Sequence, residues 1–146
     1  MNVRTRQANV VGAGPAGLTS AITLARAGWD VSVHHREPVV GRRFHGDFQG
    51  IENWSEEEDV VQMFARMGLD LPTFFSPFSE LSFHDPDKRC CRVNGRRPIF
   101  YLVKRGTEPD TLEQSLRRQA LALGVQIHPA DPQKWAAPDI PAIIAT

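Results

Sequence analysis

The sequence predicts an α/β fold, in which a parallel sheet is built on a strand–helix–strand unit and an antiparallel β-meander is inserted later in the chain. A short apolar run at Ala8–Val11 leads through a glycine-rich turn into a helix, and a second strand follows at Asp30–His34. From residue 80 onward the pattern changes to short strands separated by turn residues, which is typical of antiparallel pairing. Strand–helix–strand units require a parallel sheet with helices on its faces.

The turn after the first strand carries a G-x-G-x-x-G pattern at the start of a helix. Its three glycines have separate roles: Gly12 permits the tight turn, Gly14 lets a pyrophosphate approach the backbone, and Gly17 lets the helix pack close to the strand. The helix aims its unpaired N–H groups and positive dipole end at the phosphates. The sequence therefore predicts a Rossmann-like dinucleotide site, whose turn consists of Gly12, Ala13, Gly14, Pro15, Ala16 and Gly17.

The remainder of the first unit fits this interpretation. Apolar residues recur at helical spacing as far as Ala27, and Gly28 is suited to the position just past a helix end. The unit spans about 30 residues, the size of a mononucleotide-binding half. The competing interpretation is a glycine-rich turn in another α/β fold, without a ligand.

Bulk properties limit the classes of function. The 146 residues predict one domain, and 17 basic side chains balance 17 acidic ones, so no global field attracts nucleic acid. The chain has no apolar run of about 18 residues and no signal-peptide pattern, so we expect a cytoplasmic protein without an integral membrane segment. Cys90 and Cys91 are adjacent, have no metal-site spacing, and are expected to be ordinary strand residues.

Further elements follow the first unit. Residues Arg36–Gly50 predict a long ordered loop, and a capping box predicts that the next helix begins at Ser55 and ends at Gly68. Asn94-Gly95 between Arg89–Val93 and Arg96–Val103 is a strong hairpin signal.

The last part of the chain again alternates helix and strand. A second capping box predicts a helix that begins at Thr107 and ends at Gly124. Short strands are expected at Val125–His128 and Ala142–Ala145.

Three motifs in this order resemble the N-terminal part of FAD-dependent oxidoreductases of the glutathione-reductase type. They are V-V-G-A-G-P-A-G-L-T-S-A, then G-R-R-F-H-G-D-F-Q-G-I-E-N-W, then K-R-G-T-E-P-D-T-L-E-Q-S-L-R-R-Q-A. Within that group the chain is most similar to the geranylgeranyl-reductase-like and aromatic-hydroxylase-like flavoproteins. The resemblance extends to the I-I-A-T terminus and covers essentially the whole chain.

The resemblance implies roles for several residues. The glycine turn would hold the FAD pyrophosphate, Arg42 or Arg43 would line the flavin side of the cleft, and Arg105 would contact the cofactor. The alternative for Arg105 is a solvated charge near a helix start. The chain end at Thr146 matches the place where the family's backbone passes the adenosine.

The residue at the end of the second strand departs from the family pattern. The family carries a Glu there to bind the adenine ribose, whereas this chain has His35, followed by Arg36 and Glu37. An imidazole can bind a ribose hydroxyl, and Glu37 substitutes for the family's Glu if the strand runs longer. Alternatively, His35 and Arg36 bind a 2′-phosphate, which would make the site one for NADP.

The chain is also much shorter than members of the family, which continue into a second flavin motif and a substrate domain. We therefore expect one FAD/NAD(P)-binding domain over residues 1–146, without the family's C-terminal half. It is a fragment of a larger enzyme, or a partner chain completes its flavin site, or it is a degenerate binding module.

Three hypotheses about function follow. The first is the FAD-binding part of an oxidoreductase that transfers electrons or hydride between flavin and a small organic substrate. The second is an NAD(P)-binding domain, and the third is a non-catalytic nucleotide-binding subunit or remnant. No catalytic residue can be nominated: His45 is the one histidine in the suspected ligand loop, and no histidine pair has metal-site spacing.

Overall fold

A four-stranded parallel sheet forms one of the two parts of the fold, as the sequence predicts. The computed structural model describes residues 6–129 and 139–145. The strands lie in the order β8-β2-β1-β9, and every neighbouring pair is parallel. Their bounds are β1 Arg6–Val11, β2 Trp29–His35, β8 Gln126–Pro129 and β9 Ala142–Ile144.

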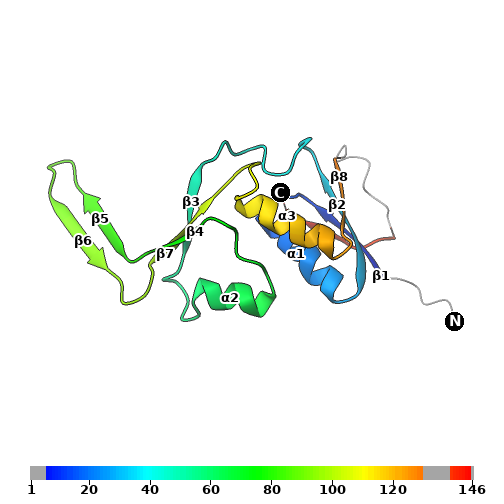
Figure 1. The fold of residues 1–146 in the computed structure, drawn as a ribbon, viewed down its shortest axis with the longest axis horizontal. Coiled ribbons are helices and arrows are strands. Elements are labelled where there is room, and N and C mark those ends of the chain that lie inside the picture. Colours follow the sequence, from blue (N-terminus) through cyan, green and yellow to red (C-terminus); the bar gives the residue numbers. More distant parts are fainter. Residues whose placement is uncertain (1–5, 130–138, 146) are drawn as a thin grey trace.

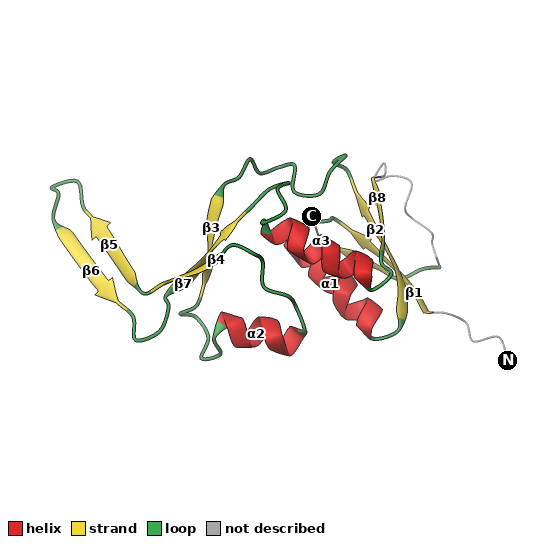
Figure 2. Ribbon diagram, in the orientation of Figure 1, coloured by secondary structure: helices red, strands yellow, loops and turns green. Residues whose placement is uncertain are grey.

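Two helices pack side by side on one face of this sheet: α1 (Pro15–Arg26) and α3 (Leu112–Ala122) (Figure 2). Their apolar faces meet the inward side chains of the strands. The largest fully buried residues of this core include Leu18, Ile22 and Leu116 from the helices and Val10, Val31 and Val33 from the strands. Burial of each such side chain stabilises the fold by about 1.5–3 kcal/mol. This packing holds α1 against β1 and so positions the turn between them.

The predicted antiparallel insertion is present, and it projects away from the parallel unit (Figure 1). It contains a three-stranded sheet in the order β3-β7-β4 and a separate two-stranded hairpin, β5-β6. The short helix α2 lies beside the three-stranded sheet (Figure 1). The bounds are β3 Phe48–Glu52, α2 Val60–Met67, β4 Phe75–Phe78, β5 Glu80–His84, β6 Cys90–Asn94 and β7 Phe100–Lys104.

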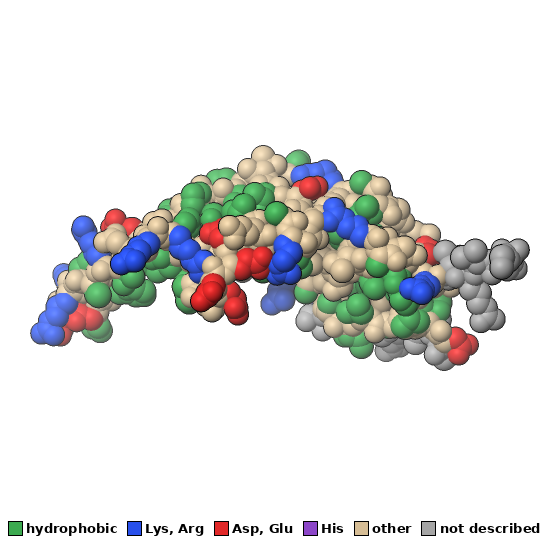
Figure 3. Space-filling model, turned by 90° about the horizontal axis from the view of Figure 1, so that it is seen from below, with side chains coloured by type: hydrophobic (Ala, Val, Ile, Leu, Met, Phe, Trp, Pro, Cys, Tyr) green, Lys and Arg blue, Asp and Glu red, His purple; other side chains and the backbone are tan. Residues whose placement is uncertain are grey.

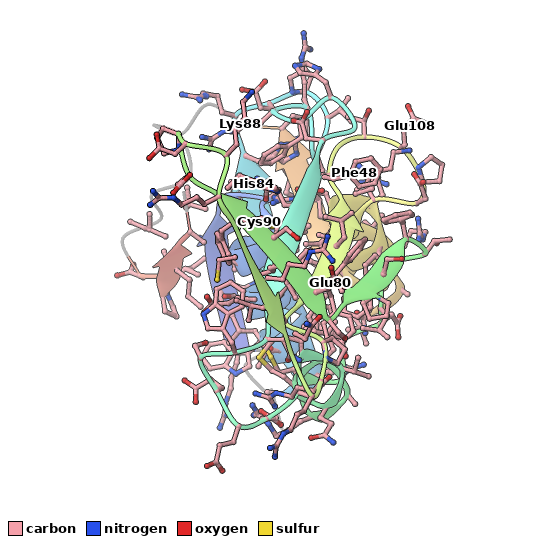
Figure 4. The ribbon with its side chains drawn as sticks, turned by 90° about the vertical axis from the view of Figure 1, so that its left-hand side faces the viewer. Phe48, Glu80, His84, Lys88, Cys90 and Glu108 are labelled. Atoms are coloured by element: carbon pink, nitrogen blue, oxygen red, sulfur yellow. The ribbon has the colours of Figure 1, made fainter. Side chains whose placement is uncertain are left out.

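The prediction of a hairpin at Asn94-Gly95 is wrong. Strand β6 pairs with β5 through the turn at residues 85–88, whereas β7 pairs with β3 and β4. Figure 4 shows His84, Lys88 and Cys90 near the turn end of the β5-β6 hairpin, and Glu80 near its other end. The Gly95 amide donates to the carbonyl of Ser79 (2.8 Å), so this glycine closes the base of the hairpin. Long-range pairing of β7 with β3 outweighs the local turn signal.

Both predicted helix starts lie four residues too early. Asp59, not Ser55, caps α2 by accepting from the Val61 amide (2.9 Å), and Thr111, not Thr107, caps α3. Each cap lies immediately before a buried apolar residue, Val60 or Leu112, which is the first residue of its helix. The predicted ends are confirmed, because Gly68 and Gly124 adopt φ +65° and +83°.

The predicted loop ends earlier than expected, because β3 already begins at Phe48. Cys90 and Cys91 are free and exposed on β6. On the face shown in Figure 3, Lys and Arg side chains are interspersed with Asp and Glu. In the described part of the chain, no helix is long and apolar enough to cross a membrane.

A buried asparagine ties the insertion together. Asn53 is 4% exposed, and its side chain donates to Asp59 (2.9 Å) and to the Pro98 carbonyl (2.7 Å) while it accepts from the Val60 amide (2.8 Å). Tyr101 donates to the same Asp59 carboxylate (3.0 Å). Burial alone would raise the pKa of the Asp59 carboxyl. The hydrogen bonds from Asn53, Val61 and Tyr101 instead hold this pKa below its usual value. This network joins the start of α2 to β7.

Asn53→Ala should therefore destabilise the protein by about 2–4 kcal/mol, because it leaves the buried Val60 amide and Pro98 carbonyl without their partner. Urea denaturation measures this loss. Asn94→Ala, at an exposed strand end, is the matched control and should change stability by less than about 0.5 kcal/mol. Equal stability of the two variants would contradict a supporting role for the network.

Candidate dinucleotide-binding cleft

The glycine turn presents the amino end of α1 to an open cleft. The Gly12 amide donates to the carbonyl of His34 (2.8 Å), which ties the turn to the end of β2, and Gly12 has φ +107°. Gly14 is the N-cap of α1 and Pro15 occupies the first turn. No side chain caps this end and its first turn contains no acidic residue. The first amides of a helix lack partners within the helix, so this end suits an anion.

Gly14 and Gly17 have different surroundings in the structure. A Cβ on Gly17 would lie 1.9 Å from the Gly12 carbonyl oxygen, so the helix can approach the strand this closely only without a side chain. A Cβ on Gly14 would meet nothing within 4 Å. The space beside Gly14 is therefore free for a ligand rather than taken by the fold.

A cleft of about 560 Å³ opens at the carboxyl ends of β1, β2 and β9. This is where open α/β sheets bind their ligands, and the volume lies within the range of known ligand sites. The cleft gathers most of the residues nominated from the sequence: Gly12, Ala13, Gly14, Pro15, Ala16, His35, Arg36, Glu37, Arg42, Arg43 and Arg105. Gly17 lies behind it in the helix, and Thr146 lies outside the described residues, although its neighbour Ala145 lines the cleft.

His35 ends β2, at the position where the family's ribose-binding carboxylate is expected. Partial burial, followed by the positive charge of Arg117 on α3, lowers the pKa of His35, while Glu37 partly opposes this effect. The ring is therefore neutral near pH 7 and can accept a hydrogen bond through one nitrogen. Arg36 and Glu37 form an exposed ion pair with 3.8 Å between the guanidinium and carboxylate atoms.

The neighbouring His34 has structural partners. Its Nε2 shares a hydrogen bond with Asn9 Oδ1 (3.2 Å), and its ring stacks on His128 with 5.6 Å between centroids. Burial and then the charge of His128 lower the pKa of His34. In the described residues, no group of three or more His, Cys, Asp or Glu side chains could hold a metal ion.

Arg105 is neither solvated nor isolated. Its Nε donates to Glu113 Oε1 (2.6 Å), Nη1 donates to Gln49, and the guanidinium carbon lies 4.1 Å from the centroid of the Phe44 ring. Its side chain is 11% exposed and that of Glu113 is 1% exposed. Glu113 and Phe44 also line the cleft, and neither was predicted from the sequence as a site residue. A carboxylate directly after Leu112 in the apolar stripe of α3 was the available signal for Glu113.

The loop between β2 and β3 is held against the start of α3. Gln114 Nε2 donates to the Val40 carbonyl (2.8 Å), and a Cβ on Gly41 would lie 2.1 Å from the Gly106 carbonyl oxygen. This close approach places Arg42 and Arg43 at the cleft. His45 instead lines a second pocket beside Lys104, which forms an ion pair with Asp110 (3.1 Å).

Comparison with known protein families agrees with this geometry. Residues 9–48, which run from β1 to the start of β3, match a family described as "FAD binding domain". The match supports FAD as the cofactor. No curated protein sequence matches the chain.

Solved structures share the fold. They include 2-methyl-3-hydroxypyridine-5-carboxylic acid oxygenase (24% identity, TM-score 0.54, 86% of this chain and 31% of the other). The flavin-dependent brominase Bmp2 is 20% identical with a TM-score of 0.56, over 84% of this chain and 28% of the other. CtdE, solved in complex with FAD, is 19% identical with a TM-score of 0.54, over 85% and 30%. The chain thus spans about a third of the length of these proteins.

Proposed function

We propose that this chain is the FAD-binding part of a flavin-dependent oxidoreductase. The observation that carries the proposal is the space beside Gly14, where the uncapped amino end of α1 meets a cleft in a segment that matches an FAD-binding family. Amides and a helix dipole at that point suit a diphosphate. Flavin, when bound, supplies electron or hydride transfer.

The chain's own residues would divide the work of binding. The amides after Gly14 would hold the diphosphate, and His35 would bind the adenine ribose. Arg42 and Arg43, which line the same cleft, add positive charge that favours an anionic ligand. The hydroxylated ribose and charged phosphates are thereby recognised by separate groups, which orient the cofactor along the cleft.

A site for NADP is the second candidate, because His35 and Arg36 replace the expected carboxylate. Arg36 is exposed at the cleft, where it could meet a 2′-phosphate. Its ion pair with Glu37 and the lowered pKa of His35 both reduce the positive charge available to such a phosphate. These two features favour FAD.

His35→Glu should strengthen FAD binding by about tenfold, since a carboxylate accepts a stronger hydrogen bond from the ribose than a neutral imidazole does. It should weaken NADPH binding through repulsion of the 2′-phosphate. Calorimetric titration of wild type and variant with both ligands measures the two effects. Weaker FAD binding by the variant would contradict the placement of His35 at the ribose.

The direct test is titration of the purified chain with FAD and NADPH, with flavin absorbance and fluorescence as readouts. The proposal expects a flavin complex with little NADPH binding. A chain that binds NADPH and not FAD would select the nicotinamide site. A chain that binds neither would leave a non-catalytic remnant.

We further propose that the whole enzyme is of the glutathione-reductase type, in its aromatic-hydroxylase-like branch, and acts on a small organic substrate. Supporting this are the three motifs in the family's order and the fold shared with an oxygenase and a brominase. The remainder of the flavin site would come from polypeptide that this sequence does not include or from a second chain.

A further inference from the structure

The most unusual group in the described structure is a buried acid at the edge of the cleft. Glu113 is 1% exposed, lies in the first turn of α3, and lines the cleft together with Arg105. A residue that served only to pack α3 would be apolar at this depth, because burial of a carboxylate is costly unless it is paired and hydrogen-bonded. The hydrogen-bond partners of Glu113 therefore decide what this buried carboxylate does.

Both carboxylate oxygens of Glu113 are used by the turn that follows β7. Oε1 accepts from Arg105 Nε (2.6 Å) and lies 2.5 Å from Nη2, and Oε2 accepts from the Gly106 amide (3.1 Å). The carboxylate thus contacts one edge of the guanidinium and also accepts a hydrogen bond from the adjacent backbone. Contacts of this kind fix the orientation of the Arg105 guanidinium as well as neutralise its charge.

Two further contacts complete the orientation of Arg105. Gln49 on β3 accepts from Nη1, and the ring of Phe44 lies under the guanidinium at 4.1 Å. A guanidinium has five N–H donors in a fixed plane, so these contacts leave donors on the outer edge. Arg105 lines the cleft, so a ligand bound there would lie beside its side chain.

We propose that Glu113 is a positioning residue of the nucleotide cleft, which acts through Arg105. It holds the guanidinium flat against Phe44 with its outer N–H groups toward a ligand oxygen, and it does not touch the ligand itself. The inference rests on the proposed function, since the ligand is taken to be FAD.

The test is a double-mutant cycle on FAD affinity with Glu113→Gln, Arg105→Lys and the double variant. Glu113→Gln keeps the shape of the side chain but removes its charge, and it should weaken FAD binding by about tenfold. Arg105→Lys keeps the charge but lacks the planar fork, and it should give a similar loss. In the Arg105→Lys background, Glu113→Gln should change the affinity by less than about twofold.

Glu56→Gln, the same change on an exposed side chain that does not line the cleft, is the control and should bind FAD as the wild type does. Urea denaturation of each apo variant separates stability from affinity. If Glu113→Gln does not fold, Glu113→Asp replaces it, because aspartate keeps the charge but is too short to hold the guanidinium in place.

The same loss of affinity in both backgrounds would overturn the inference, since it would mean that Glu113 supports the fold without acting through Arg105. Unchanged affinity on Glu113→Gln would overturn it as well. In both cases the wild type still binds FAD and the proposed function stands. Failure of the wild type to bind FAD would overturn the proposed function and this inference with it.

Discussion

Gly14→Val should abolish FAD binding, with a loss of affinity of at least about 100-fold, while the apo protein keeps its fold. The backbone of Gly14 has φ −77°, which valine can adopt, and a Cβ there meets no protein atom within 4 Å. The added methyl groups would instead occupy the space beside the amino end of α1 that the diphosphate requires. We expect the apo protein to lose no more than about 1 kcal/mol, through a poorer helix cap.

Fluorescence titration with FAD measures the affinity, and thermal unfolding of the apo protein measures the fold. Thr23→Val is the matched control, because it places the same side chain on an exposed position of α1 outside the cleft. It should bind FAD normally. Wild-type affinity in Gly14→Val would show that the ligand does not lie at the helix end.

Gly17→Ala should have the opposite profile and destabilise the whole parallel unit by about 3 kcal/mol or more. Its Cβ would lie 1.9 Å from the Gly12 carbonyl oxygen, a backbone atom that cannot rotate away. Helix α1 would have to move off β1 and lose the packing of Leu18 and Ile22 against Val10. Urea denaturation gives the change in the free energy of unfolding.

Gly14→Ala is the natural comparison for that experiment, because it makes the same chemical change three residues earlier, in open space. It should cost less than about 1 kcal/mol. If the two alanine variants were equally stable, α1 would not pack against the turn as closely as the structure indicates. The pair thus tests whether the fold requires a glycine at position 17 but not at position 14.

Contacts close in the sequence account for what was predicted correctly. The glycine turn and the positive φ of Gly68 and Gly124 depend on sterics within a few residues, so the residue types alone indicate them. The residues that line the cleft were predicted only in part. The glycine, histidine and arginine members follow from a motif, whereas Phe44 was recognised only through a contact with Arg105.

The errors arise where two local signals compete. Ser55 and Asp59 both qualify as helix caps, as do Thr107 and Thr111, and the choice in each case goes to the residue that precedes a buried side chain. Asn94-Gly95 is a good turn, but β7 gains two partners by pairing with β3 and β4 instead of β6. Burial and pairing of this kind depend on segments far apart in the chain, as in the pairing of Phe48 with Lys104.

The sequence by itself determined the strand–glycine turn–helix–strand unit and the glycines, Gly68 and Gly124, at which α2 and α3 terminate. The reason is that backbone conformation, capping and helix dipoles act over a single turn of chain. Only the tertiary structure decided how the inserted strands pair and how Glu113 meets Arg105. The strand pairing and the Glu113–Arg105 contact both depend on segments that are distant in the sequence and are buried against each other. Burial of the Glu113 carboxylate is tolerated because the Arg105 guanidinium and the Gly106 amide donate hydrogen bonds to it.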